Sequence, residues 1–212
     1  MKVGGIVLCG GKSKRMGLPK ATLPFGPELM IERVLRLLGE VVEPLVVVAA
    51  PRQELPRVSE NIIITHDKRK DCGPLEGLYA GLSAIQPYAG TAYVTSCDVP
   101  LLKQAFVRRM IDSLGEHDVA VPVDDSFHHP LAAVYRTTVL PYIKKLLNAD
   151  RMRPLFLFNE VNTNRVLVDS LKDVDSELRT LANLNRPDDY FAALKHEGFE
   201  VPTEILDRLP NS

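Results

Sequence analysis

The sequence predicts an α/β protein whose central sheet is largely parallel. Short apolar runs alternate with segments of helical periodicity over most of the 212 residues, an order typical of helices packed on a parallel sheet. The run Leu45–Ala50 is apolar at every position, whereas a strand with one face in water alternates apolar and polar residues. Such a strand is buried on both faces, so we expect helices on both sides of the sheet.

Each expected strand is a short apolar run that stands between turn-forming or polar residues. In chain order the expected strands are Val3–Leu8, Leu45–Ala50, Ile62–Thr65, Ala92–Thr95, Val119–Pro122, Leu131–Tyr135 and Arg165–Val168. The first strand ends at a glycine pair, Gly10-Gly11, and the fourth is followed by Pro100, which forces a turn.

Helices are expected where apolar residues recur at spacings of three and four. In chain order the expected helices are Met30–Leu38, Leu75–Ile85, Gln104–Leu114, Val139–Leu147 and Asp188–His196. In the first, Ile31, Val34, Leu35 and Leu38 fall on one face. The last follows Pro187, whose fixed φ suits the first turn of a helix.

Length and composition favour one domain at residues 1–196 with a peripheral tail at residues 197–212. Charged residues make up 25% and the net charge is −1, which argues against a nucleic-acid or membrane partner. Cys9, Cys72 and Cys97 are odd in number and far apart, as in a reducing cytoplasm rather than a disulfide framework or a structural zinc site. No apolar run approaches the roughly 20 residues that span a bilayer, and no signal peptide is evident. We expect a cytoplasmic protein, and a monomer by default.

The segment Leu8–Lys20 carries the strongest functional signal. Its glycines let the backbone turn with positive φ and approach a ligand closely, and successive N–H groups there form a concavity for anions. Four cations follow the glycines, at Lys12, Lys14, Arg15 and Lys20. This combination of glycines and cations favours a polyphosphate ligand. The alternative interpretation of the segment is an ordinary strand-to-helix turn whose charges face water.

Two well-known phosphate loops do not fit this segment. A Walker A loop ending at Gly11-Lys12-Ser13 would need a glycine at position 6, where the chain has Ile6. A G-x-G-x-x-G dinucleotide loop has a different glycine spacing from Gly10-Gly11.

Polar residues at strand ends are the next candidates, because ligands of open α/β sheets bind at the carboxyl ends of the strands. Asp98 follows the fourth expected strand, and a lone carboxylate beside a triphosphate is a natural Mg²⁺ ligand; alternatively it caps the next helix. Asp67 follows the third strand and could hold a base or ribose, or simply start a loop. Gly73 and Gly77 allow close backbone approach to a ligand, although Pro74 is also a common first helical residue.

Leu8–Lys20 resembles the signature L-x-G-G-x-x-x-R-M-G-x-x-K of the molybdenum cofactor guanylyltransferases, a family of the nucleotidyltransferase superfamily. The resemblance covers most of the chain and continues at Asp67, Gly73–Gly77, Cys97–Pro100, His129-Pro130 and Asn183–Asp189. Related cytidylyltransferases typically read L-A-A-G where this chain reads Leu8-Cys9-Gly10-Gly11. The resemblance implies a three-layer α/β/α, Rossmann-like nucleotidyltransferase fold. It also implies Mg²⁺-dependent transfer of GMP from GTP to the terminal phosphate of molybdopterin, with release of pyrophosphate.

The resemblance assigns roles to matching positions. The residues implied to line the GTP site are Leu8, Cys9, Gly10 and Gly11. Arg15 and Lys20 would contact phosphates, Asp67 would contact the nucleotide, and Asp98 would bind Mg²⁺. The implied catalytic residues are Arg15, Lys20 and Asp98.

The implied substrate site comprises Gly77, Asn183 and Asn185, either in the pterin pocket or between the two ligands. The implied partners are GTP, molybdopterin (with or without molybdenum), and transiently the proteins that deliver molybdopterin or receive the product. One departure is Ala50, where family members often have an Asn, so selectivity for guanine over cytosine stays open. The alternatives are a cytidylyl- or uridylyltransferase acting on molybdopterin or a sugar phosphate, and a nucleotide-binding regulator without catalysis.

Four further residues each have two possible roles. His128 and His129 precede Pro130 and could recognise the substrate, but adjacent strand residues point to opposite faces, which equally suits surface or packing roles. Arg151 and Arg153 could meet a substrate phosphate or lie in a solvated linker.

Overall fold

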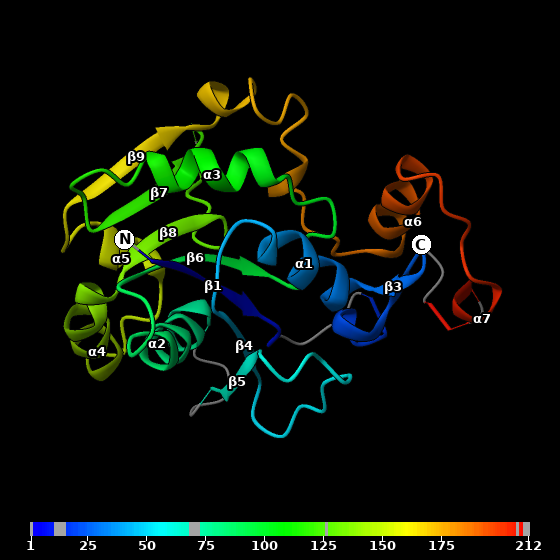
Figure 1. Ribbon diagram of the computed structural model, residues 1–212, viewed down its shortest axis with the longest axis horizontal. Helices are drawn as coiled ribbons and strands as arrows, with labels where there is room; N and C mark the ends of the chain where they lie inside the picture. Colours follow the sequence, from blue (N-terminus) through cyan, green and yellow to red (C-terminus); the bar gives the residue numbers. More distant parts are fainter. Residues whose placement is uncertain (1, 11–15, 68–72, 126, 207, 210–212) are drawn as a thin grey trace.

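A seven-stranded sheet lies at the centre of the computed structural model, which describes residues 2–10, 16–67, 73–125, 127–206 and 208–209 (Figure 1). The strand order is β5-β4-β1-β6-β8-β7-β9. Strand β8 runs antiparallel to both neighbours, and the other pairs are parallel. The predicted largely parallel sheet is confirmed.

All the expected strands are present, with small shifts at their ends. Their bounds are β1 Val3–Leu8, β4 Leu45–Ala49, β5 Ile63–His66, β6 Thr91–Ser96, β7 Val119–Val123, β8 Ala133–Arg136 and β9 Thr163–Leu167. The central strands β1 and β6 are buried at almost every position, whereas the edge strand β5 alternates between half-buried and exposed residues. Burial on both faces therefore explains the continuous apolar runs.

Helices cover both faces of the sheet (Figure 1). The helices are α1 Met30–Gly39, α2 Pro74–Ile85, α3 Gln104–Asp112, α4 Leu140–Asn148, α5 Pro154–Phe158, α6 Pro187–His196 and α7 Thr203–Leu206. Helices α2, α4 and α5 share a core with Ile6 and Leu8, and α1 and α3 share another with Val7 and Cys9. Because successive β1 side chains point to opposite faces, the protein has three layers.

A third cluster lies beside the sheet, where Figure 1 shows α6 and α7 next to the hairpin of β2 (Pro24–Phe25) and β3 (Glu28–Leu29). Phe25 packs there with Tyr190 of α6. The segment 197–212, expected to be peripheral, contributes the buried residues Ile205 and Leu209. The hairpin and α5 are absent from the sequence prediction because strands of two residues and a helix of five show no period.

Candidate functional site

The site lies where the strand order reverses. The chain goes from β1 to β4 and β5 on one side and then returns to β6 on the other side of β1. Leu8, at the end of β1, pairs with Val48 of β4 and with Ser96 of β6. The residues that follow these strands therefore meet at one edge of the sheet, the place where open α/β sheets bind ligands.

Lys20 and Asp98 meet at this edge. Lys20 opens a short 3-10 helix after the glycine segment, and Asp98 follows β6. The Lys20 Nζ donates to Asp98 Oδ2 at 2.7 Å and to Asn185 Oδ1 at 2.8 Å. The side chains of Lys20 and Asp98 are 15% and 13% exposed, so this ion pair is screened by water far less than a surface pair.

The second oxygen of Asp98 is also bound. Asn183 Nδ2 donates to Asp98 Oδ1 at 2.8 Å, and the Ser96 hydroxyl donates to the same oxygen. Asn183 Nδ2 also lies 3.2 Å from Ser96 Oγ. The Asp98 carboxylate is thus held by a cation on one oxygen and by neutral donors on the other, which fixes its orientation.

Backbone bonds hold the two asparagines in place. The Leu184 N–H donates to the Asp98 carbonyl at 2.9 Å, between Asn183 and Asn185. The Asn185 N–H donates to Asp189 Oδ2 at 3.0 Å, so the first turn of α6 is tied to the site. The structure therefore brings together Lys20, Asp98, Asn183 and Asn185, which we name the lysine–aspartate cluster.

Asp67 lies across β1 from that cluster, among small residues. A Cβ placed on Gly10 would lie 3.3 Å from Asp67 Oδ2, and one on Gly77 would lie 3.2 Å from Asp67 Oδ1 and 3.4 Å from Leu8. Burial, and secondarily the Glu76 carboxylate, raise the pKa of Asp67 to about 6. Asp67 Oδ1 is buried and has no hydrogen-bond partner among the described residues, so the carboxylate can accept a bond from a ligand.

Gln53 is a site residue that the sequence prediction missed. Its amide nitrogen donates to the Cys9 carbonyl at 3.1 Å, and its amide oxygen accepts from the Ala50 N–H at 2.9 Å. Gln53 thereby joins the ends of β1 and β4. Ala50 itself lies against Gly10, 3.6 Å from the position of a Cβ there.

Cys9 follows β1, and its thiol is buried in the core shared with α1 and α3. A hydrogen bond with Cys97, burial and the Asp98 charge raise the pKa of the Cys9 thiol well above its usual range. The thiol therefore stays protonated and unreactive at neutral pH.

The two histidines and two arginines for which the sequence left two possible roles lie outside the lysine–aspartate cluster. The His128 ring stacks on Phe158, and His129 Nε2 lies 3.2 Å from Asp124 Oδ2. Arg151 pairs with Glu160, and its guanidinium lies 4.2 Å from the centre of the Phe156 ring. Arg153 is exposed. Gly11 and Arg15 lie outside the described residues, as do Lys12, Lys14 and Cys72.

Strand order and layers together define a doubly wound α/β protein, and the polar side chains at the reversal point form its candidate ligand site at the carboxyl edge of the sheet. The chain belongs to the MobA-like NTP transferase domain family, which matches residues 5–163. It is therefore a member of a nucleotidyltransferase family.

Curated relatives and a solved structure agree with this assignment. The chain is 33% identical to a probable molybdenum cofactor guanylyltransferase of Methanosarcina acetivorans, over 87% of this chain and 86% of the relative. It is 33% identical to the molybdenum cofactor guanylyltransferase of Desulfosudis oleivorans, over 86% and 90%. The crystal structure of molybdopterin-guanine dinucleotide biosynthesis protein A from Archaeoglobus fulgidus has the same fold, with a TM-score of 0.74 and 24% identity over 93% of this chain and 99% of that one.

The described helices are all too short or too polar to cross a bilayer.

Proposed function

We propose that this protein is a molybdenum cofactor guanylyltransferase, which transfers GMP from GTP to the terminal phosphate of molybdopterin. The family and the curated relatives support the reaction class and the substrates. The single observation that carries the proposal is the lysine–aspartate cluster, because it places a cation and a carboxylate where a nucleotide would bind.

The Asp67 side of the site suits the nucleoside. Guanine presents N–H groups on its ring and its amino group, and Asp67 offers a buried oxygen that lacks a partner among the described residues. Gly10 and Gly77 leave room beside the carboxylate, since a Cβ on Gly77 would crowd Asp67 Oδ1 and a Cβ on Gly10 would crowd Asp67 Oδ2. We assign Leu8, Cys9, Gly10, Gly11 and Asp67 to the GTP site.

The reaction needs positioning more than proton transfer. An oxygen of the molybdopterin phosphate attacks the α-phosphorus of GTP, the bond from that phosphorus to the β-phosphate oxygen breaks, and pyrophosphate leaves with the electron pair. The attacking phosphate is already anionic, so no strong general base is required. Lys20 would neutralise phosphate oxygens, Arg15 would do the same from the glycine segment, and Asn183 and Asn185 with Gly77 would hold the substrate.

The residues present fit Mg²⁺. In the part of the chain that the structure describes, no group of three or more His, Cys, Asp or Glu side chains could hold a metal alone. A single carboxylate such as Asp98, completed by water and phosphate oxygens, matches the ligands that Mg²⁺ takes in nucleotide sites. Bound there, Mg²⁺ would neutralise charge on the phosphates. Lys20 would then exchange Asp98 for a phosphate oxygen.

The proposal places the chain in the cytoplasm as a monomer. Cys9 and Cys97 are both free thiols, as in a reducing compartment. Molybdopterin would be received from, and the product passed to, other proteins of the pathway by transient contact.

Pyrophosphate release tests the proposal. Purified protein would be incubated with molybdopterin, Mg²⁺ and each of GTP, CTP, UTP and ATP, and the pterin product identified by mass spectrometry. GTP-dependent formation of a guanine dinucleotide is expected. A preference for CTP or UTP would mean that the protein is a cytidylyl- or uridylyltransferase. Nucleotide binding without turnover would mean that it is a regulator without catalysis.

A matched pair of variants links the activity to the site. Asp98→Asn removes the proposed metal ligand, and a loss of about 10²-fold or more in kcat is expected. Asp173→Asn is the control, because Asp173 is an exposed carboxylate that pairs with Arg109 away from the site. Near-normal turnover of the Asp98 variant would remove Asp98 from the mechanism.

A further inference from the structure

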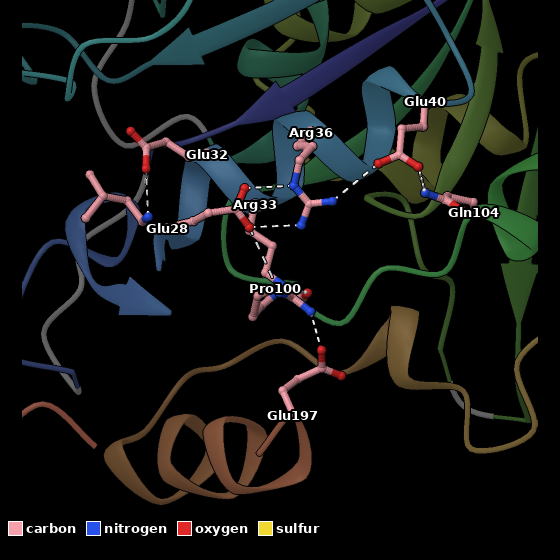
Figure 2. A network of polar contacts seen from close by, with 9 residues as sticks. Glu28, Glu32, Arg33, Arg36, Glu40, Pro100, Gln104 and Glu197 are labelled. Carbon is pink, nitrogen blue, oxygen red and sulfur yellow. Dashed lines mark hydrogen bonds and ion pairs between the residues drawn. The ribbon is translucent and has the colours of Figure 1, made fainter. Parts of the chain in front are cut away.

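Arg33 connects three segments that surround the lysine–aspartate cluster. It lies on α1, and its Nε donates to the Pro100 carbonyl at 2.9 Å. One terminal nitrogen donates to Glu197 just after α6, and another lies 4.0 Å from Glu28 on the β2–β3 hairpin. Figure 2 shows Arg33 between Glu28, Pro100 and Glu197.

The Arg33 side chain is enclosed as well as bonded. It is 12% exposed, and its guanidinium lies 5.1 Å from the centre of the Phe25 ring and 5.6 Å from that of Phe199. A charge so enclosed is stable only when it is paired and hydrogen-bonded, and here its partners come from three directions. The geometry of these contacts is therefore closely specified.

The bond to Pro100 bears directly on Asp98. The turn that follows β6 is held from two sides: the Leu184 N–H binds the Asp98 carbonyl, and Arg33 binds the carbonyl two residues later. Proline has no N–H, so the carbonyl is the only backbone polar group through which this residue can be fixed. Removing the Arg33 bond would leave the Pro100 carbonyl without its link to α1, although the Leu184 N–H would still hold the Asp98 carbonyl.

The same side chain also reaches the Lys20 side of the cluster. Phe25 and Glu28 belong to the hairpin that follows the 3-10 helix of Lys20, and Glu197 comes directly after α6, the helix that follows Asn185. Arg33 thus spans the segments that supply the cation, the carboxylate and the amide of the cluster.

We propose that Arg33 is a positioning residue for this cluster, holding Asp98 in register with Lys20 and Asn185 by fixing the Pro100 carbonyl against α1 and the end of α6. The inference rests on the proposed nucleotidyl transfer. Positioning is what this reaction demands of the protein, and a displacement of about 1 Å at such a site can cost 10²-fold in rate.

Arginine rather than lysine is required at this position. A guanidinium presents donors in a fixed planar fork and can bind the Pro100 carbonyl and Glu197 at once, whereas an ammonium is a single point charge on a flexible stem. Lys at position 33 would keep the charge and lose one of the two bonds.

The test compares Arg33→Lys and Arg33→Met with Arg36→Met. Arg36 lies on the same helix and binds Glu28 at 2.7 and 2.9 Å and Glu40 at 3.3 Å (Figure 2). Among the described residues, its side chain forms no hydrogen bond or ion pair with the Pro100 turn. Steady-state kinetics, circular dichroism to give the folded fraction, and amide hydrogen exchange over residues 97–102 are measured for each variant at one temperature.

We expect kcat of Arg33→Lys to fall at least about tenfold while KM for GTP stays within about twofold, because the nucleotide contacts remain. Exchange over residues 97–102 should speed up, and Arg36→Met should behave as wild type. Full activity in Arg33→Lys would overturn the inference. So would a kcat loss that only follows the folded fraction, or unchanged exchange.

The two proposals can fail separately. A wild-type protein that transfers no nucleotide would refute the proposed function, and the exchange measurement would still decide whether Arg33 fixes the turn. If Arg33→Met does not fold, the Arg33→Lys variant supplies the decision.

Discussion

Lys20 Nζ lies 2.7 Å from Asp98 Oδ2, although 78 positions separate the two residues. Each side chain is mostly enclosed, and each neutralises the other before any nucleotide arrives. The site therefore holds its charges at fixed positions in advance, and little reorganisation is needed when a polyphosphate takes the place of one partner.

The first prediction concerns the energetic coupling of this pair. Lys20→Met leaves the Asp98 carboxylate without its cation, and Asp98→Asn leaves Lys20 without its anion. The double variant leaves neither charge unpaired. Its loss in free energy of unfolding should therefore be smaller than the sum of the two single-variant losses, by a coupling of about 0.5–3 kcal/mol. Urea unfolding of the four proteins measures it, and strictly additive losses would mean that the two charges do not interact.

Part of this site could be predicted from the sequence because its residues stand at recognisable places. Asp98 follows an apolar run and precedes a proline, and Lys20 closes a glycine-rich segment after the first strand. Strand ends converge at one edge of a parallel sheet, so the position of such residues in the chain already suggests their position in space.

Other parts could not be predicted, because their roles depend on pairings between distant segments. Gln53 acts on the Cys9 carbonyl across 44 positions, and Arg33 acts on the Pro100 carbonyl across 67. Neither residue belongs to a motif, and an arginine on an amphipathic helix is ordinarily a solvated one. Only the packing of the hairpin and α6 against α1 encloses it.

The second prediction is a pH dependence that arises from Asp67. Burial and Glu76 raise its pKa to about 6 in the folded protein, against an ordinary value of about 3.9 in the unfolded chain. The folded state therefore holds the proton more tightly. Ionisation of Asp67 therefore lowers the free energy of unfolding progressively as pH rises from about 4 through 6, and this loss of stability persists at neutral pH.

Asp67→Asn should remove that dependence. The variant should melt at a higher temperature than wild type at pH 7.5, and the two melting temperatures should converge near pH 4. Its affinity for GTP should fall, because the Asn amide offers guanine one neutral acceptor oxygen, whereas the Asp67 carboxylate offers two charged ones. Parallel melting curves across this pH range would show that Asp67 titrates normally.

The third prediction separates binding from stability at two glycines of α2. A Cβ on Gly77 meets Asp67 Oδ1 at 3.2 Å, a contact that a small shift of the carboxylate relieves. Gly77→Ala should therefore keep or raise the melting temperature, since Ala gains about 1 kcal/mol over Gly in a helix, while KM for GTP rises.

Gly81, one turn further along, is the matched control. A Cβ there would lie 2.6 Å from Ile6 Cγ2 and 3.1 Å from Val48 Cγ2, inside the core. Gly81→Ala should lower stability by about 1–3 kcal/mol through overpacking and leave KM for GTP nearly unchanged. Urea unfolding and steady-state kinetics on both variants test the contrast, which fails if the two proteins change in the same way.

The last prediction concerns Gly26, which lies in the β2–β3 turn with φ of +66°. A Cβ there would lie 2.6 Å from Phe199 Cε2 and Cζ, so Gly26→Ala must displace a ring that encloses Arg33. Gly198 has φ of +74° and nothing within 4 Å of such a Cβ. Gly198→Ala thus carries the backbone strain alone, about 1–2 kcal/mol.

Gly26→Ala should carry the same strain and the cost of moving Phe199, so it should lose about 1–3 kcal/mol more than Gly198→Ala in urea unfolding. Because Phe199 is one of the two rings beside Arg33, kcat should fall in Gly26→Ala and not in Gly198→Ala. Equal stability losses would mean that the Phe199 ring moves aside freely. Equal kcat values would mean that the enclosure of Arg33 by the Phe199 ring has no bearing on turnover.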